Sequence, residues 1–187
     1  MADRWLVIGL GNPGPTYEKT RHNIGQVVLD HLSESQKFSS HKSRMQISEI
    51  KVDGQSVVLA KSLGYMNESG GPAKSLADFY KIDIDKIIAI HDELDLPFSS
   101  LRIKLGGGDN GHNGLKSLTA SFASADYYRI SMGRGRPIGE QDPADFVLKA
   151  FSKDERAELD SFTKRGAQAI SALILNGIDK AQTAFNS

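Results

Sequence analysis

The sequence contains no cysteine among its 187 residues. This absence excludes a disulfide framework, a thiolate zinc site, an iron–sulfur cluster and a cysteine nucleophile. It also agrees with a reducing compartment, so we expect a cytoplasmic protein. No apolar run approaches the roughly 20 residues that cross a bilayer, and the opening residues are typical of a strand rather than of a signal peptide. We therefore expect no membrane partner.

A net charge of one sign is also missing, because 23 Lys and Arg residues balance 23 Asp and Glu residues. A neutral chain argues at first sight against a nucleic-acid partner. The charges are unevenly distributed, however. Residues 100–137 carry six basic and two acidic side chains, whereas residues 140–160 carry seven acidic and three basic ones. The first segment is basic enough to contact a few phosphates, so the neutral total does not exclude a nucleic acid.

Short apolar runs and amphipathic segments alternate along the chain. Short apolar or β-branched runs predict strands at 5–9, 86–91, 101–105 and 127–133. Apolar residues at helical spacing predict helices at about 23–37, 73–80, 115–122 and 143–186. Asp53-Gly54 separates two further runs, at 44–52 and 55–61, and predicts a hairpin. The pattern predicts an α/β fold, in which a twisted mixed β-sheet is flanked by helices and residues 1–187 form a single domain.

A glycine-rich loop with the spacing Gly9-x-Gly11-x-x-Gly14 follows the first predicted strand. This spacing formally matches the dinucleotide-binding fingerprint, in which a helix begins at the last glycine and faces the pyrophosphate. Here the helical periodicity starts only near Asn23. The acidic residues found about 20 positions further on lie inside that predicted helix rather than at the end of a second strand. The loop is therefore weak evidence for a nucleotide site.

A histidine and several carboxylates follow two of the predicted strands. His22 lies in the loop before the first predicted helix, and the run that contains Asp92, Glu93 and Asp95 follows the strand at 86–91. Because the strands of an α/β sheet end in a shared crevice, these side chains are expected to converge. A buried carboxylate behind an imidazole fixes its tautomer and raises its basicity, as a general base requires. The acidic run is equally well interpreted as a solvated turn.

Three asparagines, Asn12, Asn67 and Asn113, stand in glycine-rich loops. A carboxamide offers a donor and an acceptor without charge, which suits the binding of a peptide backbone or of a developing oxyanion. Asparagine is also common in turns and at helix N-caps, and Asn67 is an equally good candidate for capping the helix that follows it. Each asparagine alone is therefore weak evidence for a site.

Several separated motifs together cover nearly the whole chain. They are Gly9-Leu10-Gly11-Asn12-Pro13-Gly14 with Tyr17, Thr20-Arg21-His22-Asn23-Ile24-Gly25, Met66-Asn67 with Ser69-Gly70, His91-Asp92-Glu93-Leu94-Asp95-Leu96-Pro97, Lys104-Leu105-Gly106-Gly107-Gly108, and Gly111-His112-Asn113-Gly114-Leu115-Lys116. In order and spacing they resemble the bacterial-type peptidyl-tRNA hydrolase family. The resemblance implies hydrolysis of the ester between a peptide and the 3′ ribose of tRNA, which recycles peptidyl-tRNA released prematurely from ribosomes. It also implies a cytoplasmic monomer without a cofactor, a metal or an obligatory protein partner.

The resemblance implies roles for single residues as well. His22 would act as the general base on a water molecule, and Asp92 would orient and polarise His22. The substrate-binding residues would be Asn12, Tyr17, Tyr65, Met66, Asn67, His112 and Asn113. Lys104 is similar to the family's phosphate-binding lysine near the tRNA acceptor end, and Arg134 is expected as a second phosphate contact.

Departures from the family pattern concern the affinity for tRNA. Ser131 stands where the family usually has the second arginine of an Arg-x-Arg pattern. Arg134 stands where an aliphatic residue is common, and it would compensate for Ser131 if its side chain faced the same groove. Tyr65 replaces a usual phenylalanine of similar size. Asp109 puts a negative charge near Lys104 in the glycine-rich loop.

Two other functions are alternatives to the hydrolysis of peptidyl-tRNA. A non-enzymatic RNA-binding relative would be expected to lack the base or its carboxylate, yet His22 and Asp92 are both present. A metal-dependent hydrolase would use the set His91, Asp92, Asp95 and His112. No pair in that set has a diagnostic spacing such as His-Glu-x-x-His, and adjacent residues of an extended strand point to opposite faces.

Overall fold

A seven-stranded mixed sheet forms the centre of the computed structural model, which describes residues 4–34, 36–137 and 142–186. The strands are β1 (Arg4–Gly9), β2 (Ser39–Ser40), β3 (Met45–Val52), β4 (Gln55–Ser62), β5 (Ile87–Glu93), β6 (Leu101–Leu105) and β7 (Tyr128–Gly133). Their order across the sheet is β2-β3-β4-β1-β5-β7-β6. The neighbours β4, β1, β5 and β7 run parallel, and β2, β3 and β6 add antiparallel pairs at the two edges. The predicted α/β fold with a mixed sheet is confirmed.

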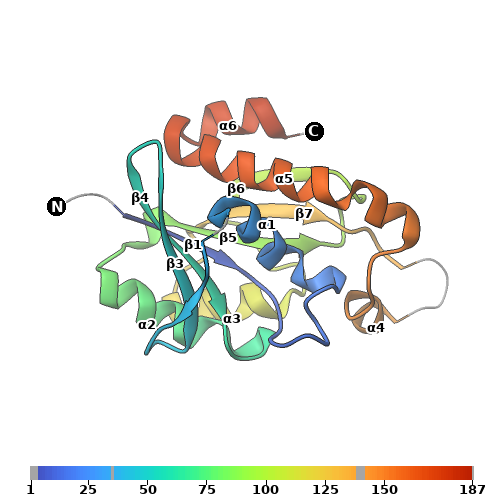
Figure 1. Cartoon of the computed structure of the whole chain (residues 1–187), viewed down its shortest axis with the longest axis horizontal. Helices are drawn as coiled ribbons and strands as arrows, with labels where there is room; N and C mark the ends of the chain where they lie inside the picture. Colours follow the sequence, from blue (N-terminus) through green and yellow to red (C-terminus); the bar gives the residue numbers. More distant parts are fainter. Residues whose placement is uncertain (1–3, 35, 138–141, 187) are drawn as a thin grey trace.

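Helices cover both faces of the sheet. They are α1 (Ile24–Ser33), α2 (Gly70–Tyr80), α3 (Asn113–Phe122), α4 (Pro143–Val147), α5 (Lys153–Asn176) and α6 (Ile178–Phe185), with 3-10 turns η1 (Arg21–Asn23), η2 (Met66–Glu68) and η3 (Ile84–Lys86). Figure 1 shows α5 and α6 above the sheet and α2 and α3 below it. None of the helices in the described ranges combines the length and the apolar character needed to cross a bilayer.

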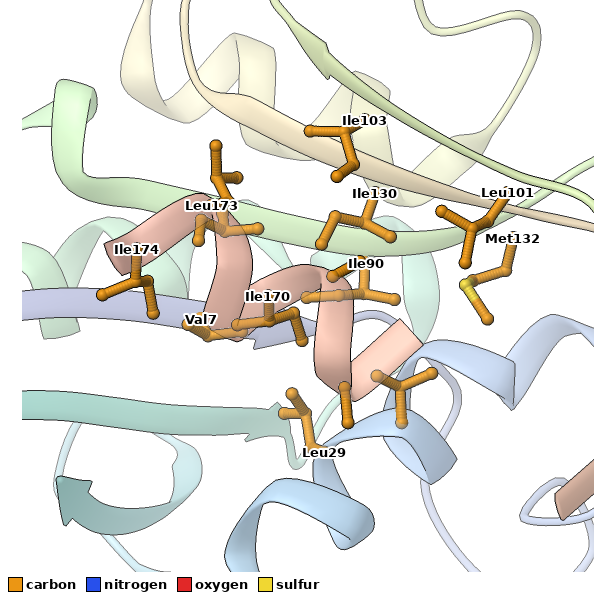
Figure 2. Packing of buried hydrophobic residues seen from close by; sticks show 14 of the residues in the cluster. Val7, Leu29, Ile90, Leu101, Ile103, Ile130, Met132, Ile170, Leu173 and Ile174 are labelled. Carbon is orange, nitrogen blue, oxygen red and sulfur yellow. The ribbon is translucent and has the colours of Figure 1, made fainter. Parts of the chain in front are cut away.

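Alternate residues of the central strands build two apolar layers, one on each face of the sheet. In β1, Val7 belongs to the layer that packs against α1 and α5, whereas Ile8 belongs to the layer that packs against α2 and α3. Figure 2 shows the first layer, in which Ile170 of α5 lies beside Val7 and Ile90 of the sheet. Because both faces of these parallel strands are buried, their sequences are continuous apolar runs rather than alternating ones.

The predicted hairpin is confirmed, since β3 and β4 are antiparallel neighbours joined by Asp53 and Gly54. Both turn residues have positive φ, 45° and 86°, which a two-residue turn that matches the strand twist requires. The first helix is shorter than predicted. It ends at Ser33 because Glu34 adopts a φ of 54°, outside the helical region. Position 35 of the predicted helix lies outside the described residues.

The strand predicted at 86–91 extends two residues further than expected. β5 continues through Asp92 and Glu93, which pair with Met132 and Gly133 of β7. Both acidic residues are buried, so the interpretation of this run as a solvated turn is wrong for them. The strand therefore carries a carboxylate into the interior at its carboxyl end.

A close approach between α1 and β5 brings the turn before α1 to that same end. A Cβ atom on Gly25 would lie only 2.3 Å from the carbonyl oxygen of Ile90, so only glycine fits this contact. The Leu10 N–H, just after β1, donates to the same carbonyl at 3.0 Å. The loop after β1, the turn η1 and the end of β5 thus meet where the parallel strands end, which is where ligands bind in such sheets.

Candidate active site

His22 and Asp92 meet at the carboxyl end of β5. The Nδ1 atom of His22 lies 2.8 Å from Oδ1 of Asp92. The Asp92 side chain is fully covered, while the His22 side chain is 11% exposed and lines a cavity. Because an ionised carboxylate only accepts hydrogen bonds, Nδ1 of His22 carries the donated proton. The lone pair of Nε2 is then the one available to act as a base.

Asp92 accepts two further hydrogen bonds. Nε2 of His112 lies 2.8 Å from Oδ1, and Nε of Arg134 lies 2.7 Å from Oδ2. Burial raises the pKa of Asp92, but attraction and hydrogen bonding to His22 and His112 outweigh burial and hold that pKa well below its usual range. Asp92 is therefore an anion at any pH at which the protein works.

The other two carboxylates of the run have different partners. Glu93 accepts from the side-chain amide of Asn110 at 2.8 Å and from the backbone N–H of Asp95 at 3.1 Å. Asp95 bonds the guanidinium of Arg136 on the exposed side of the loop. Of the three acids that were expected to converge with His22, Asp92 bonds His22 directly, Glu93 lines the same cavity, and Asp95 is not among the lining residues described.

His112 joins Asp92 to the start of α3. Its Nδ1 atom accepts the backbone N–H groups of Gly114 and Leu115, at 3.0 and 3.3 Å, and so caps the helix. Nε2 must then carry the ring proton that it donates to Asp92. The resemblance assigned His112 to the peptide groove, which it does line, but its role as helix cap and partner of Asp92 was missed. Histidine is not a typical N-cap, so no local sequence pattern indicates this role.

Asn12 fixes the loop after β1 against η2. Its Oδ1 atom accepts the backbone N–H of Met66 at 2.8 Å. Its own backbone N–H and carbonyl are both bonded by the side chain of Asn23, each at 2.8 Å. Because the carboxamide oxygen serves Met66, the Nδ2 donor is the part of Asn12 that can serve a ligand in the cavity it lines.

The other two asparagines lie on the rim of the cavity. Asn67 is exposed in η2, and the N-cap position of α2 belongs to Ser69, so the alternative of a capping role for Asn67 is wrong. Asn113 is exposed in the first turn of α3, directly after the His112 cap. Both residues line the cavity, where their carboxamides can bind a polar ligand.

One cavity of about 730 Å³ contains most of the expected site residues. Its lining includes Asn12, His22, Tyr65, Met66, Asn67, Asp92, His112, Asn113 and Arg134. Tyr17 supports the rim, because its ring packs edge-on against the exposed ring of Tyr65 with centroids 6.2 Å apart. Lys104 is exposed on the edge strand β6. Asp109, expected near Lys104, accepts the Gly111 N–H and lines the cavity.

The wall opposite these residues comes from α4 and the residue after it, with Ala144, Val147 and Leu148 in the lining. Arg21 holds this wall in place. Its guanidinium lies 4.0 Å from the centre of the Phe146 ring and forms an ion pair of 2.9 Å with Glu155 at the start of α5. The sequence analysis missed this contact, because 134 residues separate Arg21 from Glu155 and no local pattern joins them.

Two residues that bear on the expected phosphate contacts are buried. The Arg134 side chain is only 6% exposed, and its guanidinium is bonded to Asp92 and to the Gly135 carbonyl, so it is not presented on an open phosphate-binding face. Ser131 is fully buried, and its Oγ atom lies 2.9 Å from Nε2 of His91. Position 131 therefore faces the interior of this structure.

His91 is a buried, neutral histidine. Its Nδ1 atom donates to the backbone carbonyl of Asp92 at 2.8 Å, and Nε2 accepts the Ser131 hydroxyl. Burial, with a smaller effect of His112, lowers the pKa of His91 to about 3. His91 therefore contributes a fixed pair of hydrogen bonds beneath the site rather than a titrating group.

The geometry of the site also bears on the metal-binding alternative. Ligand-type atoms of His22, Asp92 and His112 lie within 4.8 Å of one another, and they are the single such group found in the described ranges. The set proposed from the sequence, with His91 and Asp95, is not brought together. Because Nδ1 of His112 accepts the α3 N–H groups, its Nε2 atom holds a proton and has no lone pair for a metal.

Comparisons with known proteins agree on one family. The model of the family described as peptidyl-tRNA hydrolase matches residues 6–187. A peptidyl-tRNA hydrolase of Streptomyces coelicolor is 51% identical over 191 residues, which cover 98% of this chain and 95% of the relative. One from Frankia casuarinae is 46% identical over 185 residues, with coverages of 98% and 94%. The crystal structure of peptidyl-tRNA hydrolase from Acinetobacter baumannii gives a TM-score of 0.91 at 28% identity and covers 100% of this chain and 96% of that one.

Proposed function

This chain belongs to the peptidyl-tRNA hydrolase family and hydrolyses peptidyl-tRNA, and we propose that His22 is the general base of the reaction. The observation that carries the proposal is the 2.8 Å contact between Nδ1 of His22 and Oδ1 of a buried, ionised Asp92. That contact fixes the ring so that Nε2 is the basic nitrogen on the cavity side. The alternative of a non-enzymatic relative is contradicted by the comparisons, since the relatives are named as hydrolases.

The chemistry requires only water and a base, because an ester is already an activated acyl group. Nε2 of His22 takes a proton from water while the water oxygen attacks the ester carbonyl carbon. The tetrahedral intermediate then expels the 3′ oxygen of the ribose, which takes the proton from His22. One water is consumed, and the products are a tRNA with a free 3′ hydroxyl and a peptide carboxylic acid, which loses its proton to the solvent to become a carboxylate. Asp92 stabilises the imidazolium between the two proton transfers.

The asparagines supply neutral hydrogen bonds around the reacting ester. Nδ2 of Asn12 is the donor for the oxyanion, since its partner atom Oδ1 already holds the Met66 loop. Asn67 and Asn113 bind peptide groups or the attacking water from the rim. Met66, Tyr65 and His112 line the peptide side, and Tyr17 supports Tyr65. Such contacts suit a substrate whose peptide sequence varies, because they read backbone groups rather than side chains.

The tRNA is bound through phosphates at a few exposed basic residues, of which Lys104 on the edge strand β6 is the foremost. We further propose that the enzyme acts as a single-domain monomer in the cytoplasm, without a metal or cofactor. The complete absence of cysteine supports a reducing compartment.

The Asp92→Asn variant tests the proposed mechanism. Asparagine keeps the size of the side chain but cannot stabilise the imidazolium, so kcat on an N-acetyl-aminoacyl-tRNA should fall by about 10²–10⁴ with little change in KM. Asp78→Asn, the same substitution at an exposed ion pair on α2, should leave kcat unchanged. A kcat of Asp92→Asn close to that of the parent enzyme would contradict the mechanism.

Excess chelator tests the metal alternative on the same substrate. Full activity after chelation is the expected result, because the base and the water need no Lewis acid. Loss of activity that zinc restores would favour a metal at the group formed by His22, Asp92 and His112.

A further inference from the structure

Arg134 reaches Asp92 from the strand next to β5. In the paired strands, Asp92 of β5 stands opposite Met132 of β7, and Arg134 follows two residues later. Its backbone N–H donates to the Glu93 carbonyl at 3.0 Å, and its Nη1 atom donates to the Gly135 carbonyl at 2.9 Å. Both the backbone and the head of Arg134 are therefore held in place, with Nε 2.7 Å from the Asp92 carboxylate.

We propose that Arg134 is a positioning residue that acts through Asp92 and sets the lowest pH at which His22 can serve as a base. This inference rests on the proposed role of His22. It differs from the phosphate contact expected from the sequence, because the guanidinium is turned inward and engaged. It assigns to Arg134 an effect on proton transfer rather than on tRNA affinity.

The proposal depends on the charged and titratable groups around Asp92. His22 from η1, His112 from the start of α3 and Arg134 from the end of β7 all face the carboxylate. His91, the neighbour on β5, is neutral and bonds the backbone carbonyl of Asp92 instead. His112 is neutral while it accepts the α3 N–H groups. While His22 is unprotonated, the positive charge of the Arg134 guanidinium therefore balances the negative charge of the Asp92 carboxylate.

Other charged groups around the site have partners of their own. Glu93 accepts from Asn110 and from a backbone N–H, Asp109 accepts the Gly111 N–H, and Arg21 beside His22 is paired with Glu155. A proton on His22 therefore adds a second positive charge to a buried carboxylate that already carries one. Like charges in a site of low dielectric oppose each other, so Arg134 makes proton uptake by His22 less favourable.

The consequence is a base that stays unprotonated at lower pH. Without the guanidinium, the full charge of a buried carboxylate would act on His22 alone, and His22 would hold a proton over more of the pH range. The acidic limb of the pH profile of kcat/KM reports on the free enzyme's essential base. Replacing Arg134 should therefore change the pH at which that limb occurs.

Two substitutions separate the charge of Arg134 from its hydrogen bond. In Arg134→Gln, Nε2 of glutamine stands as many bonds from Cα as Nε of arginine does, so the donor to Asp92 is kept while the charge is lost. Arg134→Lys keeps the charge and is the matched control. Arg134→Ile, with the aliphatic type common at this position in the family, provides a second uncharged side chain should Arg134→Gln fail to fold.

The measurement is kcat/KM for an N-acetyl-aminoacyl-tRNA between pH 4.5 and 8. The acidic limb should move to higher pH by about one unit in the uncharged variants and remain near the parent position in Arg134→Lys. The Kd for tRNA and its salt dependence should be the same in all of them. A limb that does not move in a folded, uncharged variant would overturn the proposal, and a reduced salt slope with an unmoved limb would restore the phosphate role.

The His22→Ala variant, measured on the same substrate, distinguishes a failure of this proposal from a failure of the proposed function. If His22→Ala is inactive and the limb of Arg134→Gln is unmoved, the assignment of the base stands and the role of Arg134 is wrong. If His22→Ala retains activity, the mechanism itself is wrong, and the role of Arg134 falls with it.

Discussion

His22 and Asp92 are 70 residues apart in the chain, yet their side chains are joined by a contact of 2.8 Å between Nδ1 and Oδ1. The imidazole comes from a turn before α1, and the carboxylate comes from the last part of β5. The contact depends on the close packing of Gly25 against β5, which brings the turn to the end of the strand. A base and its orienting anion are thus positioned by the rigid centre of the fold.

Asn12→Asp should remove the donor proposed for the oxyanion while keeping the bond that holds the loop. The carboxylate can still accept the Met66 N–H, but it puts a negative charge where negative charge develops in the transition state. We expect kcat to fall by about 10²–10³, with the thermal unfolding temperature close to that of the parent protein. Steady-state kinetics together with a thermal melt make the check, and a parental kcat would contradict this role of Asn12.

His91→Asn should change how stability depends on pH. The pKa of His91 is about 3 in the folded protein, below its ordinary value of 6.5, so the unfolded chain binds a proton that the folded protein does not. As the pH falls below 6.5, the free energy of unfolding therefore decreases by about 1.4 kcal/mol per pH unit. The lowered pKa of Asp92 adds to this loss only below about pH 4.

The His91→Asn variant lacks the imidazole, so it does not take up this proton when it unfolds. Urea unfolding at pH 6 and pH 4 should show the parent losing about 2.5 kcal/mol more than His91→Asn over that interval. Asparagine can still donate to the Asp92 carbonyl, so the variant should fold at pH 6. An equal loss in both proteins would mean that His91 is not neutral in the folded state.

Lys104→Ala should weaken tRNA binding and reduce its salt dependence. A lysine that neutralises one phosphate contributes about 0.7–0.9 to the slope of log K against log salt concentration, and the variant should lose that amount. Lys51→Ala is the matched control, because Lys51 is exposed on β3 toward the opposite edge of the sheet. Equal slopes in both variants would mean that the phosphates are bound elsewhere.

The order of strands and helices could be predicted because each element has a local pattern. The apolar runs of β1, β5 and β7 are continuous since both of their faces are buried, and Asp53-Gly54 marks its hairpin. The end of β5 could not be predicted, because Asp92 and Glu93 look like loop residues until their partners are known. Those partners come from three separate segments of the chain, which contain His22, Asn110 with His112, and Arg134.

A site residue could be predicted where both its own chemistry and a sequence motif indicate its role. His22, Asp92 and the three asparagines fall into this class, and the structure brings them to one cavity. The contact of Arg134 with Asp92 was not predicted, because a basic residue in a basic segment is most simply interpreted as a phosphate contact. Only the register of β7 beside β5 shows that its guanidinium turns inward to Asp92.

The turnover of the His22→Ala variant decides whether His22 is the general base. Cleavage of an N-acetyl-aminoacyl-tRNA and binding of the same tRNA should be measured on one preparation, with a thermal melt to show that the variant is folded. The account predicts that cleavage is nearly abolished, by at least about 10², while the Kd for tRNA stays within about threefold. Cleavage at close to the parental rate in the folded variant would contradict the assignment of His22 as the base.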